Sequence, residues 1–286
     1  MKARLRRSIA VVAAALSAAG AVSIGTAGSS AAQTAGLRAY GISADGTLMA
    51  TFTTDRPQVL DWVRVITGLS GDTALLGIDF RIQNGLLYGV GNNGGVYTIS
   101  MPPATPDVVV KKVSQLSVPL WGTSFGVDFN PAADRLRLVS DQGQNLRHNL
   151  ADGVTAEDAI LTTPPALGPT RGVTAAAYTN NDLNPDTATT LVDINTATDQ
   201  VMIQSPANNG TLAATGALGV DAGPNAGFDI YSDLVAGKTV SVTGFATLAV
   251  GGQSSLYSVN LLTGAATAVG QYPLNIGDIA VALDTN

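Results

Sequence analysis

The stretch Gly77-Ile78-Asp79-Phe80 recurs along the chain and decides its fold. Each copy joins a glycine or small turn residue, an apolar residue, usually an aspartate, and a further apolar run. The other copies are Gly126-Val127-Asp128-Phe129, Gly172-Val173-Thr174-Ala175, Gly227-Phe228-Asp229-Ile230 and Ile276-Gly277-Asp278-Ile279. Their third positions are separated by steps of 49, 46, 55 and 49 residues. A repeat of this length is typical of the blades of a β-propeller.

One repeat contains four predicted strands. They span Leu75–Phe80, Leu86–Val90, Val96–Ser100 and Val108–Val113, and the turn Asn84-Gly85 is a hairpin signal. Four strands are the content of one propeller blade. A β-solenoid usually has a shorter period, and a sandwich does not repeat one strand-turn phrase five times.

The two ends of the chain complete one another. Ile276–Leu283 is a first strand without successors, whereas Leu37–Ile42, Thr47–Thr53 and Leu60–Ile66 lack a first strand. Pairing them would close a ring and remove exposed strand edges. The sequence therefore predicts an all-β propeller of about five four-stranded blades, with Lys238–Thr243 as an added segment.

Residues 1–32 are expected to be a secretory signal peptide. Four basic residues lie between Lys2 and Arg7, an apolar run covers Ile9–Ile24, and small residues allow cleavage near Ala32. The apolar run is shorter than the roughly 20 residues that span a bilayer. Residues 33–286 are then one propeller domain, located outside the cell or in its envelope.

Charge and cysteine content exclude several classes of function. The chain has 15 basic and 21 acidic residues, and four of the basic ones lie in the leader. This balance opposes binding to nucleic acid. The absence of cysteine rules out disulfides, thiolate metal sites and a cysteine nucleophile. We expect a monomer without a membrane-spanning segment once the leader is removed.

The repeated aspartates have two interpretations. Equivalent positions in a closed ring point to equivalent places, so Asp79, Asp128, Asp229 and Asp278 are expected near the central channel, with Thr174 at this position in the copy that begins at Gly172. Carboxylate oxygens in a ring can bind calcium. Alternatively, each carboxylate accepts hydrogen bonds from a turn or from the next blade. Repetition in every blade favours the structural role.

The repeat that begins at Phe125 is the most polar and least symmetric, and it is the third repeat when the strands from Leu37 to Ile66 are counted as the first. Its arginines fall on one strand face by alternation and could hold a carboxylate or phosphate, with nearby amides binding sugar hydroxyls. Ion pairs with Asp128 and Asp134 are the alternative. The candidate ligand-binding residues are Arg135, Arg137, Gln144, Asn145 and Arg147.

His148 is the one histidine of the chain, so it cannot build a histidine-rich zinc, copper or iron site. No Gly-x-Ser-x-Gly motif is present either. We expect His148 to be an exposed turn residue.

A candidate calcium loop lies in the fourth repeat, after its first predicted strand Val173–Tyr178. Oxygen-bearing residues alternate as they do at the start of such a loop. However, Pro185 lies inside it, and Thr187 replaces the turn glycine. The candidate ligands are Asp182, Asn184 and Asp186.

Several motifs, in order, resemble the bacterial domain-of-unknown-function 4394 family. The resemblance covers about Leu37 to Leu283 and implies an exported, propeller-like protein without an established activity or catalytic residues. It is carried by Gly77–Phe80 with Gly85-Leu86-Leu87-Tyr88-Gly89, Val127-Asp128-Phe129-Asn130-Pro131, Gly143-Gln144-Asn145-Leu146-Arg147, Ala176-Ala177-Tyr178-Thr179-Asn180 and Gln204–Leu212.

The sequence favours a non-catalytic binding module for a small molecule, a glycan or an envelope protein, because no catalytic constellation is recognisable. One alternative is a hydrolase or lyase for a carbohydrate or lactone that uses the channel carboxylates. A second is a cell-surface structural protein stabilised by calcium, which is the one cofactor that the sequence suggests.

Overall fold

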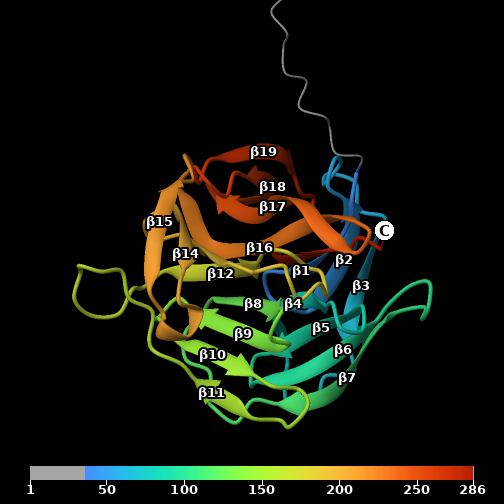
Figure 1. Cartoon of the computed structure of the whole chain (residues 1–286). Helices are drawn as coiled ribbons and strands as arrows, with labels where there is room; N and C mark the ends of the chain where they lie inside the picture. The colour runs from blue at the N-terminus through green and yellow to red at the C-terminus, as the bar shows by residue number, and fades with distance from the viewer. Residues whose placement is uncertain (1–35, 286) are drawn as a thin grey trace, which may run out of the picture. The chain divides into compact units, whose positions relative to one another are not determined.

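The repeated phrase forms the innermost strand of each sheet. The computed structural model describes residues 36–285, which contain twenty β-strands (Figure 1). The predicted leader lies outside these residues. Each phrase begins one strand of a four-stranded antiparallel group, and we name these groups blades, each after its inner strand. The predicted all-β propeller architecture is confirmed.

The strands of each blade follow one another outward in chain order. The β4 blade comprises β4 (Leu75–Arg81), β5 (Leu86–Gly91), β6 (Gly95–Ser100) and β7 (Val108–Gln115). The β8 blade comprises β8 (Phe125–Asn130), β9 (Arg135–Ser140), β10 (Asn145–His148) and β11 (Thr155–Glu157). The β12 blade comprises β12 (Val173–Tyr178), β13 (Leu191–Asn195), β14 (Gln200–Gln204) and β15 (Leu212–Ala217). The β16 blade comprises β16 (Ala222–Val235), β17 (Lys238–Val250), β18 (Gln253–Val259) and β19 (Ala266–Gln271).

The remaining blade combines the two ends of the described chain. Strand β20 pairs antiparallel with β1, from Ala39 opposite Val281 to Ser43 opposite Ile276. Its outer strand β3 also makes a short parallel pairing with β7, where Ile66 faces Val108. The β20 blade comprises β20 (Ile276–Val281), β1 (Arg38–Ser43), β2 (Leu48–Thr53) and β3 (Trp62–Thr67).

Glycine occurs in the repeated phrase because neighbouring inner strands approach closely. A Cβ atom on Gly126 would lie 2.4 Å from the backbone nitrogen of Ala176 in β12. A Cβ atom on Gly227 would lie 2.4 Å from Cα of Asp278 in β20. No side chain fits at such distances, so glycine allows the inner strands to pack against one another.

The apolar residues of the inner strands fill the spaces between adjacent blades. Val127 and Phe129 of β8 are buried in a cluster with Tyr88 of the β4 blade, whose ring lies 5.2 Å from that of Phe129. Ala177 and Phe228 belong to a second cluster between β12 and β16. Burial of one such large side chain stabilises the fold by about 2 kcal/mol.

The β16 blade departs from the predicted plan. Lys238–Thr243, expected as an added segment, continues directly into β17 and forms a long hairpin with β16. Tyr231 faces Thr243 in this hairpin, and the tip lies at Ala236 and Gly237. The described part of the chain also has one 3-10 helix, η1 (Ala207–Asn209). None of its helices has the length and apolar character needed to cross a membrane.

Candidate functional site: carboxylates of the inner strands

Three of the repeated aspartates converge. Carboxylate oxygens of Asp79, Asp128 and Asp229 all lie within 4.8 Å of one another. The three residues come from β4, β8 and β16, and each is at most 4% exposed. Oxygen-only donors at this spacing are the ligands that hard cations such as Ca²⁺ prefer. We name these three residues the axial triad.

Each carboxylate of the axial triad also binds the backbone of a neighbouring blade. Asp79 accepts the N–H of Phe129 at 2.6 Å, and Asp128 accepts the N–H of Tyr178 at 3.1 Å. Asp229 accepts the N–H of Val281 at 2.5 Å. The predicted structural role, hydrogen bonding to the next blade, is therefore present in the triad.

Asp278 lies one layer away from the triad. Asp278 accepts the N–H of Ile78 at 2.8 Å, and Ile78 is the residue before Asp79. Asp79, by contrast, accepts the N–H of Phe129, which is the residue after Asp128. By the same pattern, alanines at 177 and 280 occupy the triad positions of β12 and β20. The expectation that Asp278 is equivalent to the other aspartates was wrong, because Asp278 lies two residues before Ala280 and takes the place that Gly77 and Gly126 have in β4 and β8.

Thr174 is not equivalent either. It lies at the β-bulge between Val173 and Ala175, and its hydroxyl is 3.3 Å from that of Thr196. The repeat phrase aligned Thr174 with the aspartates, but Thr174 lies three residues before Ala177, the residue at the triad position of β12. The triad level therefore carries three carboxylates and two alanines rather than a uniform ring.

Burial raises the pKa of all four aspartates, and repulsion by neighbouring carboxylates adds to it for Asp79, Asp128 and Asp278. Burial is the main cause, and the charge of Asp229 further raises the pKa of Asp79 and Asp278. The charges of Asp79 and Asp229 raise that of Asp128, and burial raises the pKa of Asp229 to about 6. Two unit charges 4.8 Å apart repel by about 3 kcal/mol at an effective dielectric constant of 20. Backbone N–H donors favour the ionised form, so the two effects oppose each other.

A polar pocket of about 260 Å³ opens where the inner strands begin. Its lining contains polar groups and Gly277, the residue before Asp278, but not Asp278 itself. The polar groups come from Ser43, Ser124, Asn225 and Asn275. Asn225 donates a hydrogen bond to the side-chain oxygen of Asn275 at 3.2 Å. By strand position, Asp278 stands between this pocket and the axial triad.

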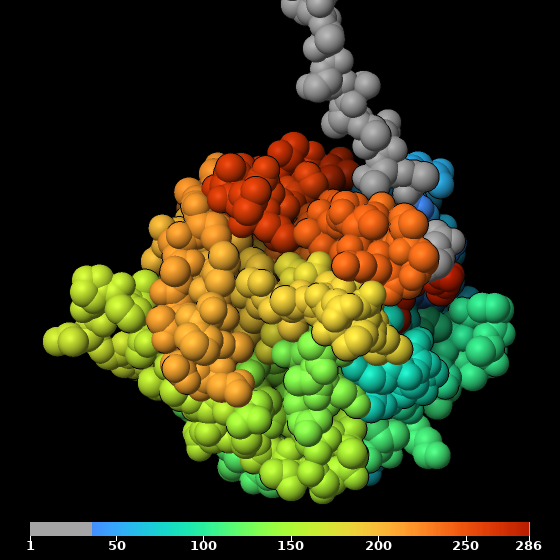
Figure 2. Space-filling model, viewed as in Figure 1, coloured from blue at the N-terminus to red at the C-terminus, as the bar shows by residue number. Residues whose placement is uncertain are grey.

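The opposite ends of the inner strands are covered by two linked segments. In Figure 2, the loop after β12 (yellow) and the β16–β17 hairpin (orange) lie near the centre of the face in view. Asp182 in the loop accepts hydrogen bonds from the N–H and the hydroxyl of Thr239 in the hairpin, at 2.9 and 2.6 Å. This contact ties the loop to the hairpin.

In the candidate calcium loop, the side-chain oxygens of Asp182 and Asn184 accept hydrogen bonds from the protein itself. The second oxygen of Asp182 accepts the N–H of Asn184, whose own side-chain oxygen accepts the N–H of Asp186. These bonds and those from Thr239 lower the pKa of Asp182 against the effect of burial. Asp186 is exposed. These bonds form successive turns stabilised by side chains. They do not direct the side-chain oxygens of Asp182, Asn184 and Asp186 toward a common centre.

The arginines of the third repeat belong to a second, separate network. Arg137 is 3% exposed and donates to Asn145 at 2.7 Å, Asp158 at 2.8 Å and Tyr178 at 3.2 Å. Arg147 also donates to Asp158, at 2.9 Å. This network joins the β8 and β12 blades, and its guanidinium donors are occupied by protein acceptors.

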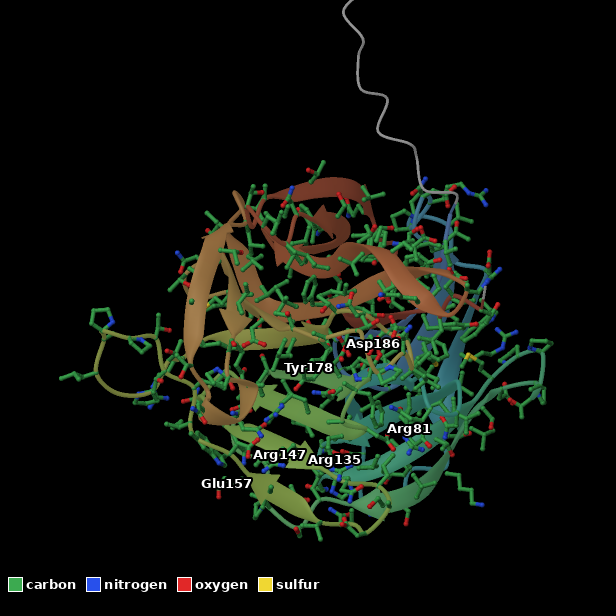
Figure 3. The ribbon with its side chains drawn as sticks, in the orientation of Figure 1. Arg81, Arg135, Arg147, Glu157, Tyr178 and Asp186 are labelled. Atoms are coloured by element: carbon green, nitrogen blue, oxygen red, sulfur yellow. The ribbon has the colours of Figure 1, made fainter. Side chains whose placement is uncertain are left out.

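The other predicted residues of this repeat are apart from the triad. Arg135 donates to the carbonyls of Ala133 and Asp134, and Figure 3 shows Arg135 and Arg147 out on the β8 blade, away from Tyr178. Gln144 is buried and holds the backbone of Pro119 and Trp121.

The prediction for His148 was wrong. It was expected in an exposed turn, but it is fully buried in β10, where its ring nitrogens bind the hydroxyls of Ser114 and Thr155. Burial lowers its pKa.

Sequence reasoning did not select the polar residues of the pocket. Ser124, Asn225 and Asn275 each lie two residues before a glycine of the repeated phrase, and an alignment on these glycines was the signal that could have found them. Asp193 is a further buried polar residue that is absent from the predicted sites. It is fully buried in β13, within an otherwise mostly apolar strand, which was its signal.

Comparison with known proteins gives a family but no activity. No curated protein matches the chain. Among solved structures, the chain is similar to the glutaminyl cyclase of Myxococcus xanthus, with 11% identity over 75% of this chain and 90% of that chain and a TM-score of 0.47. It is also similar to a chain of a nidogen/laminin complex, with 9% identity, coverage of 86% and 98%, and a TM-score of 0.46. An auxiliary nutrient binding protein from Bacteroides ovatus has 14% identity, coverage of 61% and 42%, and a TM-score of 0.38.

The match to a family model extends over most of the chain. Residues 48–280 match the model described as a domain of unknown function, DUF4394. This range includes the whole axial triad and the start of β20. The chain therefore belongs to the DUF4394 family.

Proposed function

We propose that the protein is a secreted, non-catalytic binding propeller that holds a divalent cation of the calcium type on its axial triad. The observation that carries this proposal is the convergence of three buried carboxylates from three blades within 4.8 Å. A doubly charged cation would offset their repulsion, while the backbone N–H groups continue to orient the carboxylates.

Within residues 36–285, no arginine or lysine forms an ion pair with the axial triad. The ion pairs among residues 36–285 involve Asp55, Asp61, Asp134 and Asp158, none of which belongs to the triad. The triad must therefore retain protons or acquire a cation to lower its charge. At neutral pH, a bound cation offsets the repulsion between the carboxylates and is coordinated by their oxygens.

The geometry offers less support for the hydrolase alternative. A glycosidase needs two carboxyl groups that flank a substrate bond. All four inner-strand aspartates are buried and accept backbone hydrogen bonds, and none lines the pocket at the start of the strands. A role in holding the blades together with a cation agrees better with these contacts.

Asp128→Asn is the most selective test of the triad. One oxygen of Asp128 accepts the N–H of Tyr178, and asparagine retains such an acceptor. By contrast, Asp79 and Asp229 use both oxygens to accept backbone N–H groups. The control is Asp186→Asn, which removes the same charge from an exposed loop.

The measurement is thermal unfolding at pH 7.5 with calcium and with chelator. A ligand at 100 times its Kd stabilises the folded state by about 2.7 kcal/mol. We expect calcium to raise the Tm of the wild type and of Asp186→Asn by several degrees, and to leave that of Asp128→Asn unchanged. Equal Tm values of the wild type with calcium, other divalent cations and chelator would overturn the proposal.

A further inference from the structure

Two aromatic residues, Tyr40 and Trp62, line a second pocket that contains no residue of the axial triad. This pocket has a volume of about 420 Å³ and is lined by Tyr40, Thr51, Trp62, Arg38 and the pair Pro102-Pro103. It lies between the β20 blade and the loop that joins β6 to β7, which can be followed in Figure 1. Its volume is within the range of small-molecule sites.

The aromatic wall is held in place by neighbouring rings. The ring of Tyr40 lies 6.4 Å from that of Trp62 and meets the ring of Phe80 edge-on at 5.8 Å. Trp62 and Phe80 also pack against the buried cluster that includes Ile78 and Tyr97. Two rings fixed from behind form a wall that a ligand can contact without ordering it first.

A charged pair supplies polar groups beside this wall. Arg38 forms an ion pair with Asp61 at 2.5 Å and reaches the hydroxyl of Thr51 at 3.4 Å, in both cases through Nη1. Within residues 36–285, Nε and Nη2 of Arg38, the indole N–H of Trp62 and the hydroxyl of Tyr40 form no side-chain hydrogen bond. These groups remain available to a ligand.

We propose that this pocket binds a pyranose sugar. A pyranose has one apolar C–H face, which suits an aromatic ring, and a rim of hydroxyls, which suits planar donors and acceptors. The guanidinium of Arg38 disfavours a cationic ligand, and its pairing with Asp61 provides both a donor and an acceptor for adjacent hydroxyls. The inference rests on the proposed binding role of the protein but not on the axial cation.

The two tryptophans of the chain permit a direct test. Trp121→Phe leaves Trp62 as the only indole, so its fluorescence reports on this pocket alone. Cellobiose, lactose and N,N′-diacetylchitobiose are titrated into this variant in the presence of chelator, which separates the result from any cation effect. We expect at least one disaccharide to change the emission of Trp62 in a saturable manner.

Two further variants locate the binding. Arg38→Met, at a half-exposed side chain, is expected to weaken binding of that disaccharide at least tenfold. Arg56→Met is the control, because Arg56 is exposed and also lies beside an aspartate but does not line the pocket. Calorimetry with Trp62→Phe, which retains a ring, is expected to show weaker binding.

The proposal is overturned if none of the three sugars alters the emission of Trp62, or if Arg38→Met and Arg56→Met bind equally well. Saturable binding of a proline-rich peptide in place of every sugar would also overturn it, because an aromatic groove can take that ligand as well. Failure of these titrations would leave the calcium result at the triad unaffected, so the two proposals fail separately.

Discussion

Asp193 is a buried carboxyl group whose ionised form is disfavoured by its surroundings. It is fully buried, and neither of its carboxylate oxygens has a hydrogen-bond partner within the described chain. Burial raises its pKa to about 8, although the charge of Arg137 acts in the opposite direction. On the neighbouring strand, Gln204 also has a buried side-chain oxygen without a partner. A proton on Asp193 supplies a donor on the same face of this sheet.

We expect Asp193→Asn to change the pH dependence of stability. Because the folded-state pKa exceeds the unfolded value near 4, wild-type stability is lost as pH rises from about 4 through 8. The neutral amide does not titrate, so the variant should have a Tm above that of the wild type at pH 8.5 and close to it at pH 5. Calorimetry at both pH values measures this difference.

Asp186→Asn serves as the matched control, since its carboxylate is exposed. It should leave the difference between the two pH values as in the wild type. A Tm for Asp193→Asn that falls by the same amount at pH 5 and pH 8.5 would show that the carboxylate is needed in its charged form or for its shape.

At the scale of the strand, the glycine of the repeated phrase sets the spacing of the inner strands. An added methyl group at Gly126 would meet the backbone of Ala175 and Ala176 at 2.7 and 2.4 Å. Backbone of a neighbouring strand cannot move aside as a flexible side chain does. The aspartate that follows can then accept a backbone N–H of the adjacent strand because the strands lie so close.

Gly126→Ala is therefore expected to destabilise the fold by about 1–3 kcal/mol, the usual cost of overpacking. Chemical denaturation of the purified protein measures the free energy of unfolding. Gly223→Ala is the control, because its added Cβ would come no closer than 3.3 Å, to the carbonyl oxygen of Ala249. Equal free energies of unfolding for the two variants would contradict the close approach of β8 and β12.

At the scale of the whole molecule, the inner-strand carboxylates link stability to pH and to cations. The folded-state pKa values of the triad and of Asp278 are raised, that of Asp229 to about 6. Stability from these groups is present at about pH 4 and decreases as pH rises through their folded-state pKa values. Carboxylates stabilised by ion pairs have the opposite effect, because their contribution to stability increases as pH rises.

We expect the metal-free protein to lose stability between pH 4.5 and 7.5, and calcium to restore it at pH 7.5 with little effect at pH 4.5, where protons compete for the same oxygens. Thermal unfolding of the Asp193→Asn variant at both pH values, with calcium and with chelator, isolates the inner-strand contribution. A calcium effect of equal size at both pH values would argue for a site elsewhere.

The whole-molecule architecture was predictable because the repeat is a property of the sequence. Glycine, an apolar residue and aspartate recur at the spacing of a blade, and each has a physical task in the packing of inner strands. The site was only partly predictable. The alignment brought Asp79, Asp128 and Asp229 together, but it misplaced Asp278 and Thr174, which lie two and three residues before the alanines at the triad positions of β20 and β12. Only the hydrogen bonds between neighbouring inner strands reveal this offset.

The polar cluster of the third repeat shows a different limit. Local charge density suggested a ligand site, yet the acceptors for Arg137 come from several segments, including Asp158 and Asn208. Those partners lie 21 and 71 residues away in the chain, so only the packing of two blades reveals them. His148 was misassigned for the same reason, because its partner Ser114 lies in the preceding blade.

The most direct test of the central claim is anomalous diffraction from crystals of the protein grown with calcium or manganese. Our account predicts an anomalous peak enclosed by the carboxylates of Asp79, Asp128 and Asp229, and its loss in Asp128→Asn. Crystals saturated with either cation that show no peak between these carboxylates would contradict the account and leave the triad as a hydrogen-bonding device of the inner strands.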